Sequence, residues 1–272
     1  MAGQTWLVDA AQRQGAKVIV VAMRDRLTDL PLDQLLGCRL NGIEVLDGTA
    51  FFERTGHKIP LAQLQPDYLV FNDGFHWPPR LAKRALDLLL ASFGLLLTLP
   101  LFMLLPLIIK ATSSGPVFYR QERAGLNGRR FTILKFRSMY DKAEQVGCPV
   151  WAQEQDPRIT PIGRLMRRYR LDELPQMINV LHGDMSFVGP RPERPEFVAL
   201  LAREIPFYAL RLTVKPGITG WAQIMFRYGA TVQDAAEKLQ YDLYYIKHMS
   251  IALDSLIALK TIRTVLLQSG AR

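Results

Sequence analysis

The feature that most constrains this chain is an uncharged apolar run from Leu88 to Ile109, LLLASFGLLLTLPLFMLLPLII. A straight helix of that length would reach roughly 33 Å, about the hydrocarbon thickness of a bilayer. Pro100 and Pro106 interrupt the run, and a proline inside a helix removes a hydrogen bond and clashes with the preceding turn. We therefore expect a break or sharp kink near Leu99. The part before the break would reach only about 18 Å, which is too short to span a bilayer.

Basic residues flank the run on both sides, with Arg80, Lys83 and Arg84 before it and Lys110, Arg120 and Arg123 after it. A simple span would place one of these clusters on the disfavoured face of the membrane. A re-entrant helix that enters, bends at Pro100 and leaves on the same side keeps both clusters cytoplasmic, and we favour this topology. A kinked single span and a buried core helix are the alternatives.

The charge balance narrows the choice of partners. The 272 residues carry a formal net charge of +9, which favours an anionic partner such as nucleic acid, anionic lipid or a phosphorylated substrate. Cys38 and Cys148 lie far apart without metal-ligand spacing, a pattern typical of inert thiols in a reducing compartment. The four histidines are scattered along the chain, so no zinc site or histidine-based triad is indicated.

Residues 1–76 alternate between helix and strand patterns. The first 17 residues predict a short amphipathic helix ending at Gly15 rather than a signal peptide. The runs KVIVVAM, NGIEVLD and DYLVFND then predict strands, the first of them buried. This is the pattern of a partial Rossmann-like α/β domain, but it contains no GxGxxG. We expect a docking or regulatory role here rather than nucleotide binding, with GFHWPPR (74–80) as the linker.

The rest of the chain carries most of the motifs. Two strand-like runs surround GLNG, where Asn127-Gly128 signals a hairpin turn. The stretch DELPQMINVLHG predicts a short helix with Asp172 as N-cap, Pro175 in the first turn and Gly183 just past the end. Two longer helical patterns follow toward the C-terminus.

The stretch RRYRLDELPQ sets three arginines before two adjacent carboxylates. On a regular helix Asp172 and Glu173 would point about 100° apart, so they do not form a shared-proton pair. At a helix start both can flank one site, with one coordinating a cation and the other free to attack. Such oxygen ligands suit Mg²⁺, which binds through one or two carboxylates plus substrate phosphates. With nearby arginines and helix N–H groups, the stretch indicates a Mg²⁺-bound diphosphate and phosphoryl transfer. A solvated helix face is the alternative.

Two further stretches offer phosphate ligands. KFRSM places Lys135, Arg137 and Ser138 at a predicted strand end, where they are candidate phosphate donors or simply a charged strand end. The prolines of GPRPERPEF would hold Arg191 in a fixed direction, which suits a site residue. In the turn-rich loop KPGITGWAQ, Trp221 could cover a ligand ring or pack inside the fold.

Taken together, these segments resemble the bacterial sugar transferase family, the monotopic phosphoglycosyl transferases of polysaccharide assembly. The matching stretches are KRALDLLLASFGLLLTLPL, GPVFYRQERAGLNGRRFTILKFRSM, LDELPQMINVLHGDMSFVGPRP, KPGITGWAQ and YDLYYIKHMS. The N-terminal zone and ERPEF resemble the exopolysaccharide branch, whose members carry transmembrane helices and a Rossmann-like domain before the transferase. Against that pattern, this sequence shows only part of the Rossmann-like domain.

The resemblance implies transfer of a sugar 1-phosphate from a UDP-sugar to undecaprenyl (polyprenyl) phosphate, with release of UMP. It casts Asp172 as the nucleophile that forms an aspartyl-phosphosugar intermediate and Glu173 as the Mg²⁺ ligand. The family's membrane segment is a re-entrant helix broken at a proline, which Pro100 matches. The substrate- and phosphate-binding candidates are Lys135, Arg137, Ser138, Arg167, Arg191 and, more weakly, Arg227.

The expected fold class is α+β. It comprises a partial Rossmann-like domain over 1–76, a proline-broken re-entrant membrane helix over 80–111, and a mostly helical catalytic domain with a small β-hairpin over 112–272. We expect the bacterial inner membrane as the location, with the catalytic domain on the cytoplasmic face.

The expected partners are a UDP-sugar, polyprenyl phosphate and membrane lipid, without nucleic acid. A homodimer is compatible with the sequence, and the sugar is not defined by it. The alternative function is a non-catalytic, basic membrane-surface binding or scaffold protein. A nucleotide-sugar dehydratase or nucleic-acid binder is disfavoured, because the sequence has neither GxGxxG nor an aromatic–basic RNA motif.

Overall fold

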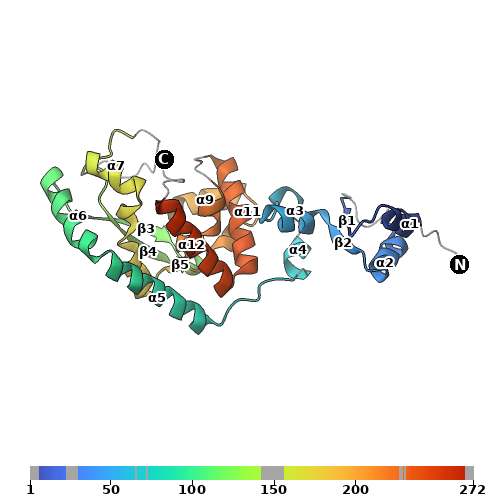
Figure 1. Ribbon diagram of the computed structural model, residues 1–272. Helices are drawn as coiled ribbons and strands as arrows, with labels where there is room; N and C mark the ends of the chain where they lie inside the picture. Colours follow the sequence, from blue (N-terminus) through green and yellow to red (C-terminus); the bar gives the residue numbers. More distant parts are fainter. Residues whose placement is uncertain are drawn as a thin grey trace. The chain divides into compact units, whose positions relative to one another are not determined.

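The computed structural model describes residues 6–22, 30–64, 66–71, 73–141, 156–226, 229 and 231–266. It divides into two compact units, a first unit of residues 1–72 and a second unit of residues 73–272. The described chain is mostly helical, and its strands form three two-stranded sheets (Figure 1). A mostly helical chain with small sheets confirms the coarse fold prediction.

The first unit contains a two-stranded parallel sheet with helices packed beside it. Its elements are α1 (Trp6–Arg13), β1 (Val18–Val21), α2 (Leu32–Leu40), β2 (Glu44–Asp47), α3 (Gly48–Gly56), the 3-10 turn η1 (Leu61–Gln63) and α4 (Pro66–Phe71). The pairing of β1 with β2 confirms the strands predicted in KVIVVAM and NGIEVLD. Val18 and Val20 are exposed, however, so β1 is not the buried strand that its apolar composition predicts.

The strand predicted in DYLVFND is wrong, because residues 66–71 form helix α4. Pro66 suits a helix start, where its fixed φ is already helical and a missing N–H leaves no bond unmade. Tyr68 is buried and donates its hydroxyl to Glu53 of α3 at 2.5 Å. The prediction relied on local strand propensity, which takes no account of a contact between two separate helices.

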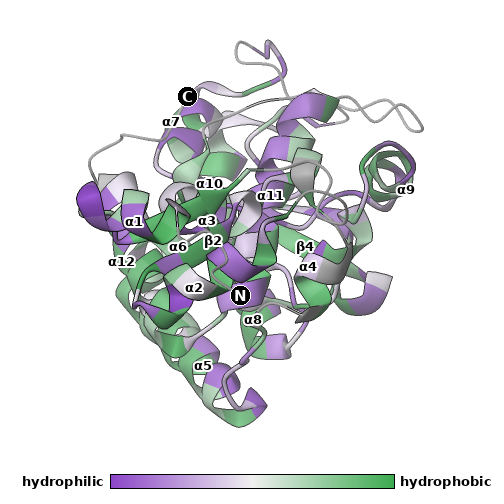
Figure 2. Cartoon of the chain, turned by 90° about the vertical axis from the view of Figure 1, so that its right-hand side faces the viewer, coloured by the Kyte–Doolittle hydropathy of each residue, from purple (hydrophilic) through white to green (hydrophobic). Residues whose placement is uncertain are grey.

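The apolar run forms two helices, α5 (Arg80–Leu97) and α6 (Leu99–Thr112), bent by 61°. The break falls where the sequence predicts it, because Pro100 has no N–H with which to continue the helical ladder. Instead, the N–H and hydroxyl of Thr98 both bond to the Gly94 carbonyl, at 3.0 and 2.7 Å. Figure 2 shows much of both helices as hydrophobic. Within the described ranges no single helix could cross a membrane by length and composition, whereas this bent pair together could.

The remaining elements of the second unit include a β-hairpin and two long C-terminal helices. They are β3 (Phe118–Ala124), η2 (Leu126–Gly128), β4 (Arg130–Phe136), α7 (Pro161–Arg168), η3 (Leu171–Glu173), α8 (Gln176–His182), β5 (Ser186–Val188), α9 (Pro195–Glu204), η4 (Tyr208–Leu212), β6 (Gly217–Thr219), α10 (Trp221–Met225), α11 (Val232–His248) and α12 (Ile251–Leu266). The antiparallel pairing of β3 with β4 confirms the predicted hairpin. Asn127 and Gly128 both adopt the positive φ values, 54° and 75°, that the turn requires.

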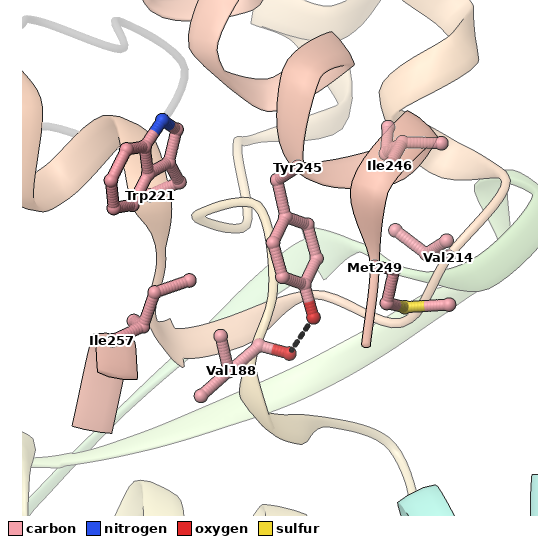
Figure 3. Packing of buried hydrophobic residues seen from close by; sticks show 7 residues of the cluster. All are labelled: Val188, Val214, Trp221, Tyr245, Ile246, Met249 and Ile257. Carbon is pink, nitrogen blue, oxygen red and sulfur yellow. Dashed lines mark hydrogen bonds between the residues drawn. The ribbon is translucent and has the colours of Figure 1, made fainter. Parts of the chain in front are cut away.

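A buried apolar cluster joins the C-terminal helices to the strand β5. Its members are Val188, Val214, Trp221, Tyr245, Ile246, Met249 and Ile257 (Figure 3). Trp221 is 4% exposed and packs inside the fold, which was one of its two predicted roles. The Tyr245 hydroxyl donates to the Val188 carbonyl at 3.1 Å, which fixes β5 against α11.

Two basic residues near the start of α5 fasten the bent helix pair to the rest of the second unit. Lys83 forms ion pairs with Asp87 at 3.1 Å and with the fully buried Asp254 of α12 at 2.8 Å. Arg84 donates to the carbonyls of Val180 and Leu181 at 2.6 and 2.8 Å, at the C-terminal end of α8. Arginine at a helix C-terminus satisfies carbonyls that have no intrahelical partner. The bent pair of α5 and α6 is therefore tied directly to α8, the helix that follows the acidic motif.

Candidate active site

Asp172 and Glu173 lie in the short turn η3, between α7 and α8. The chain leaves α7 at Tyr169 and turns through Arg170, which adopts a left-handed φ of 53°. Both acidic side chains are buried. The prediction of Asp172 as the N-cap of α8 is wrong. Pro175 has no N–H to donate to the Leu171 carbonyl, and the helix begins only at Gln176. The predicted C-terminal stop is confirmed, since Gly183 follows α8 with a φ of 103°.

Helix α8 is fixed to the hairpin through Asn179. Its side-chain oxygen accepts from the N–H of Leu134 at 3.0 Å, and its side-chain nitrogen donates to the carbonyl of Thr132 at 2.8 Å. Both partners lie on β4, which ends one residue after Lys135. These two hydrogen bonds bring the end of β4 beside η3, and so bring Lys135 to Glu173.

Glu173 is held by two cations. Lys135 Nζ lies 2.9 Å and Arg191 Nη2 lies 2.5 Å from the same carboxylate oxygen, Oε1. Burial by itself raises the pKa of Glu173, but the charges of Arg191, then Lys135, and the Arg191 hydrogen bond hold the pKa well below its usual range. Glu173 is therefore ionised at neutral pH.

Asp172 lies in a different electrostatic environment from its neighbour. Burial is the largest influence and raises its pKa; Lys135 opposes this, Glu173 adds to it, and Arg167 and Arg191 oppose it more weakly. The net direction is upward. Two adjacent carboxyls whose pKa values move in opposite directions are suited to different chemical roles. One is a fixed anion, and the other is a buried carboxyl whose ionised form is disfavoured by the loss of hydration.

Arg167 and Ser138 meet at the other side of this turn. Arg167 Nε donates to Ser138 Oγ at 2.9 Å, and Arg167 also acts electrostatically on Asp172. Of the other arginines in the motif, Arg168 is exposed, whereas the charge of Arg170 acts on Glu173. The structure thus places Lys135 and Arg191 on Glu173 and the charge of Arg167 near Asp172, with Ser138 bonded to Arg167. Phosphate binding by these four residues stays a prediction.

Arg137 is directed elsewhere. Its guanidinium donates to the carbonyls of Ser114 and Ser113 at 2.6 and 2.8 Å and to the Ser113 hydroxyl at 2.8 Å. These groups lie immediately after α6, so Arg137 closes the C-terminal end of the bent helix pair. Arg227, the remaining phosphate-binding candidate, lies outside the described residues.

Two residues that support the site were not predicted from the sequence. Arg211 donates to the backbone carbonyl of Arg191 at 2.9 Å, and Asp242 forms an ion pair with Arg211 at 3.0 Å. Asp242 had a detectable signal, because it falls between Leu239 and Leu243 on the inward face of a predicted helix. Arg211 had none, since its neighbours in sequence form only a short irregular turn.

The acidic pair fits Mg²⁺ only in part. Within the described residues no group of three or more His, Cys, Asp or Glu side chains could hold a metal. A magnesium ion that binds through one or two carboxylates and the phosphates of a substrate does not require such a group. Buried, ionised Glu173 offers the hard oxygen donors that this mode of binding uses.

Comparison of the sequence with known proteins identifies a matching family and several relatives. The model of the family described as "Bacterial sugar transferase" matches residues 78–268. A relative from Aeromonas hydrophila, named UDP-N-acetylgalactosamine-undecaprenyl-phosphate N-acetylgalactosaminephosphotransferase, is 49% identical over 190 residues, which cover 70% of this chain and 45% of the relative. The UDP-glucose:undecaprenyl-phosphate glucose-1-phosphate transferase of Escherichia coli K12 is 43% identical over 185 residues, covering 67% and 40%.

A third relative, the exopolysaccharide production protein ExoY of Rhizobium meliloti, is 37% identical over 205 residues, covering 70% of this chain and 88% of that protein. The chain spans less than half of the length of the first two relatives. The matched region of this chain contains both carboxylates, the four cationic and hydroxyl side chains around them, and the bent pair of α5 and α6. The chain belongs to the bacterial sugar transferase family.

Proposed function

We propose that this chain transfers a sugar 1-phosphate from a UDP-sugar to undecaprenyl phosphate, releases UMP, and so initiates exopolysaccharide synthesis. The observation that carries the proposal is the buried pair Asp172 and Glu173, whose pKa values move apart among three converging cations. The names of the relatives support it. One is named for N-acetylgalactosamine and another for glucose, so we leave the sugar open.

In the proposed first step, a carboxylate oxygen of Asp172 attacks the phosphorus next to the sugar. A P–O bond forms to Asp172, and the bond to the bridging oxygen breaks, so UMP leaves with the electron pair. In the second step, a phosphate oxygen of undecaprenyl phosphate attacks the same phosphorus and releases Asp172. Burial leaves the attacking carboxylate poorly hydrated, while Lys135 and Arg167 make its charge tolerable.

The cations have separate tasks in this scheme. Arg191 and Lys135 orient Glu173 and present positive charge to the donor diphosphate. Glu173 would hold Mg²⁺, which when bound neutralises diphosphate charge. Ser138 keeps Arg167 directed toward the site. We assign Arg137 to the end of α6 rather than to phosphate, because Nη1 and Nη2 both donate there, while the buried Nε has no hydrogen-bond partner among the described residues.

We further propose that α5 and α6 form a re-entrant hairpin in the bacterial inner membrane, with the catalytic domain on the cytoplasmic face. The 61° bend and the basic residues on both flanks support this topology. Undecaprenyl phosphate carries its phosphate at the membrane interface, so a shallow anchor would keep the site at the depth of the acceptor. The first unit is assigned a docking or regulatory role.

The test is a UMP-release assay with the full chain in detergent, Mg²⁺, undecaprenyl phosphate and separate UDP-sugars. Asp172→Asn should abolish UMP release, because the amide cannot form the intermediate. Without acceptor, intact-protein mass should show a phosphosugar adduct on the wild type and none on the variant. Asp184→Asn, a partly exposed acid beyond the far end of α8, is the matched control and should behave as wild type. Normal turnover by Asp172→Asn would refute the nucleophile, and absence of UMP release by the wild type with every UDP-sugar would refute the function.

A further inference from the structure

The loop that carries Arg191 is held through its carbonyl oxygens. Pro190 and Pro192 have no N–H to donate, so the loop's own backbone offers few hydrogen bonds. Four consecutive carbonyls nevertheless each accept one: Pro190 from Gly217 N at 2.9 Å, Arg191 from Arg211 Nη2 at 2.9 Å, Pro192 from Arg123 Nη1 at 3.2 Å, and Glu193 from Ala124 N at 2.9 Å. The backbone of Arg191 is therefore oriented by groups outside the loop.

Arg211 is the donor that acts on Arg191 itself. It lies on η4, is buried, and uses each nitrogen of its guanidinium. Nε and Nη2 lie 3.2 and 3.0 Å from Asp242 Oδ2, Nη1 donates to the Tyr208 hydroxyl at 2.8 Å, and Nη2 also donates to the Arg191 carbonyl. A planar guanidinium holds these acceptors at fixed mutual angles, which an ammonium group does not do.

Stability alone is a weak reason for this arrangement. A buried ion pair is often no more stabilising than apolar residues of similar volume, because both charges lose their hydration. The pair instead bonds to the carbonyl of the residue whose side chain reaches Glu173 at 2.5 Å. A continuous chain of contacts runs from α11 through Asp242, Arg211 and Arg191 to the acidic pair.

We propose that Arg211, held by Asp242, is a positioning residue that sets the direction in which Arg191 presents its guanidinium to Glu173 and to the donor diphosphate. This inference rests on the proposed function. Arg211 does not contact Glu173 in the described geometry, and it acts only through the backbone of Arg191.

The first test compares Arg211→Lys with the wild-type full chain in detergent. Lysine keeps the positive charge beside Asp242 but cannot bridge the aspartate, the tyrosine hydroxyl and the Arg191 carbonyl together. We expect kcat/KM for the UDP-sugar to fall on the order of 10- to 100-fold, as for other small displacements of a positioned group. The matched control is Leu239→Ala, a buried residue on the same helix as Asp242. It should lower the unfolding temperature without changing kcat/KM per folded protein.

The second test is a double-mutant cycle with Arg191→Lys, read by equilibrium binding of UDP as well as by turnover. If Arg211 acts through Arg191, Arg211→Lys should weaken UDP binding in the wild-type background and change it less than about twofold in the Arg191→Lys background. Equal losses in both backgrounds, or no loss beyond that of Leu239→Ala, would overturn the proposal. Failure of the transferase function would look different: the wild type would release no UMP, while the cycle for UDP binding would still report the coupling.

Discussion

Asp172 and Glu173 adjoin in the chain, but their carboxylates have different partners. The Glu173 carboxylate contacts Lys135 and Arg191 directly, and its pKa falls despite burial. Burial dominates at Asp172 and raises its pKa. A carboxylate whose charge is already neutralised by two cations is a poor nucleophile and a good fixed anion, whereas a carboxylate with little hydration and no such pairing is the more nucleophilic of the two once it is ionised. At the scale of single residues, this difference supports the roles that we propose, Asp172 as attacker and Glu173 as metal ligand.

Lys135 and Arg137 are two residues apart at the end of β4, but their side chains have different partners. Lys135 contacts Glu173, whereas Arg137 donates to the carbonyls that follow α6. We expect Lys135→Met to lower kcat/KM on the order of 100-fold, because it removes one of the two cations on Glu173. Arg137→Met should instead lower the free energy of unfolding by about 1–3 kcal/mol, since the carbonyls of Ser113 and Ser114 at the end of α6 lose their donors. Steady-state kinetics and thermal unfolding in detergent of both variants check this. Unchanged stability with weakened UDP binding in Arg137→Met would restore Arg137 as a phosphate ligand.

At the scale of elements, the sequence predicts those features that depend on only a few neighbouring residues. The break before Pro100 and the turn at Asn127-Gly128 were predictable because a missing N–H and a positive φ act within a few residues. Helix α4 was not predictable from DYLVFND, since its Tyr68 is placed by Glu53 from a different helix. The contact between Lys135 and Glu173 depends on Asn179, which joins α8 to β4. Residue types were therefore readable from the motifs, whereas their pairing required the fold.

The bend between α5 and α6 gives a test of membrane topology. In a background with Cys38 and Cys148 replaced, single cysteines at Leu81 and Ala111 should both react from the cytoplasmic side, because a re-entrant pair returns both flanks to one face. Pro100→Ala restores an N–H that can continue the helix, so part of the population should straighten. The Ala111 cysteine should then become reactive from the periplasmic side, while the Leu81 cysteine should not change. Impermeant maleimide labelling of cells and of inverted vesicles reads this out, and opposite-side labelling without Pro100→Ala would establish a span.

At the scale of the whole molecule, the described candidate-site residues all belong to the second unit. The division between units falls after Asn72, close to residue 76, the predicted end of the N-terminal domain. The predicted linker is not merely a spacer. The Phe75 N–H donates to the Lys247 carbonyl at 2.7 Å, and Trp77 Nε1 donates to the Ile246 carbonyl at 2.9 Å. Both acceptors lie near the C-terminal end of α11, where carbonyls have no intrahelical donor.

Two truncations separate the contribution of this segment from that of the first unit. The fragment 73–272 should keep kcat/KM within about threefold of the full chain, because a compact unit with its own core can fold alone. The fragment 80–272 loses the bonds from Phe75 and Trp77 to α11, so its free energy of unfolding should be lower by about 1–3 kcal/mol. Because α11 carries Asp242, this loss should also lower activity, as Arg211 and then Arg191 become less well oriented. UMP release and thermal unfolding of both fragments measure these effects. If 73–272 were inactive although folded, the first unit would have to take part in catalysis, and if 80–272 matched 73–272 in both measurements, residues 73–79 would be a passive linker.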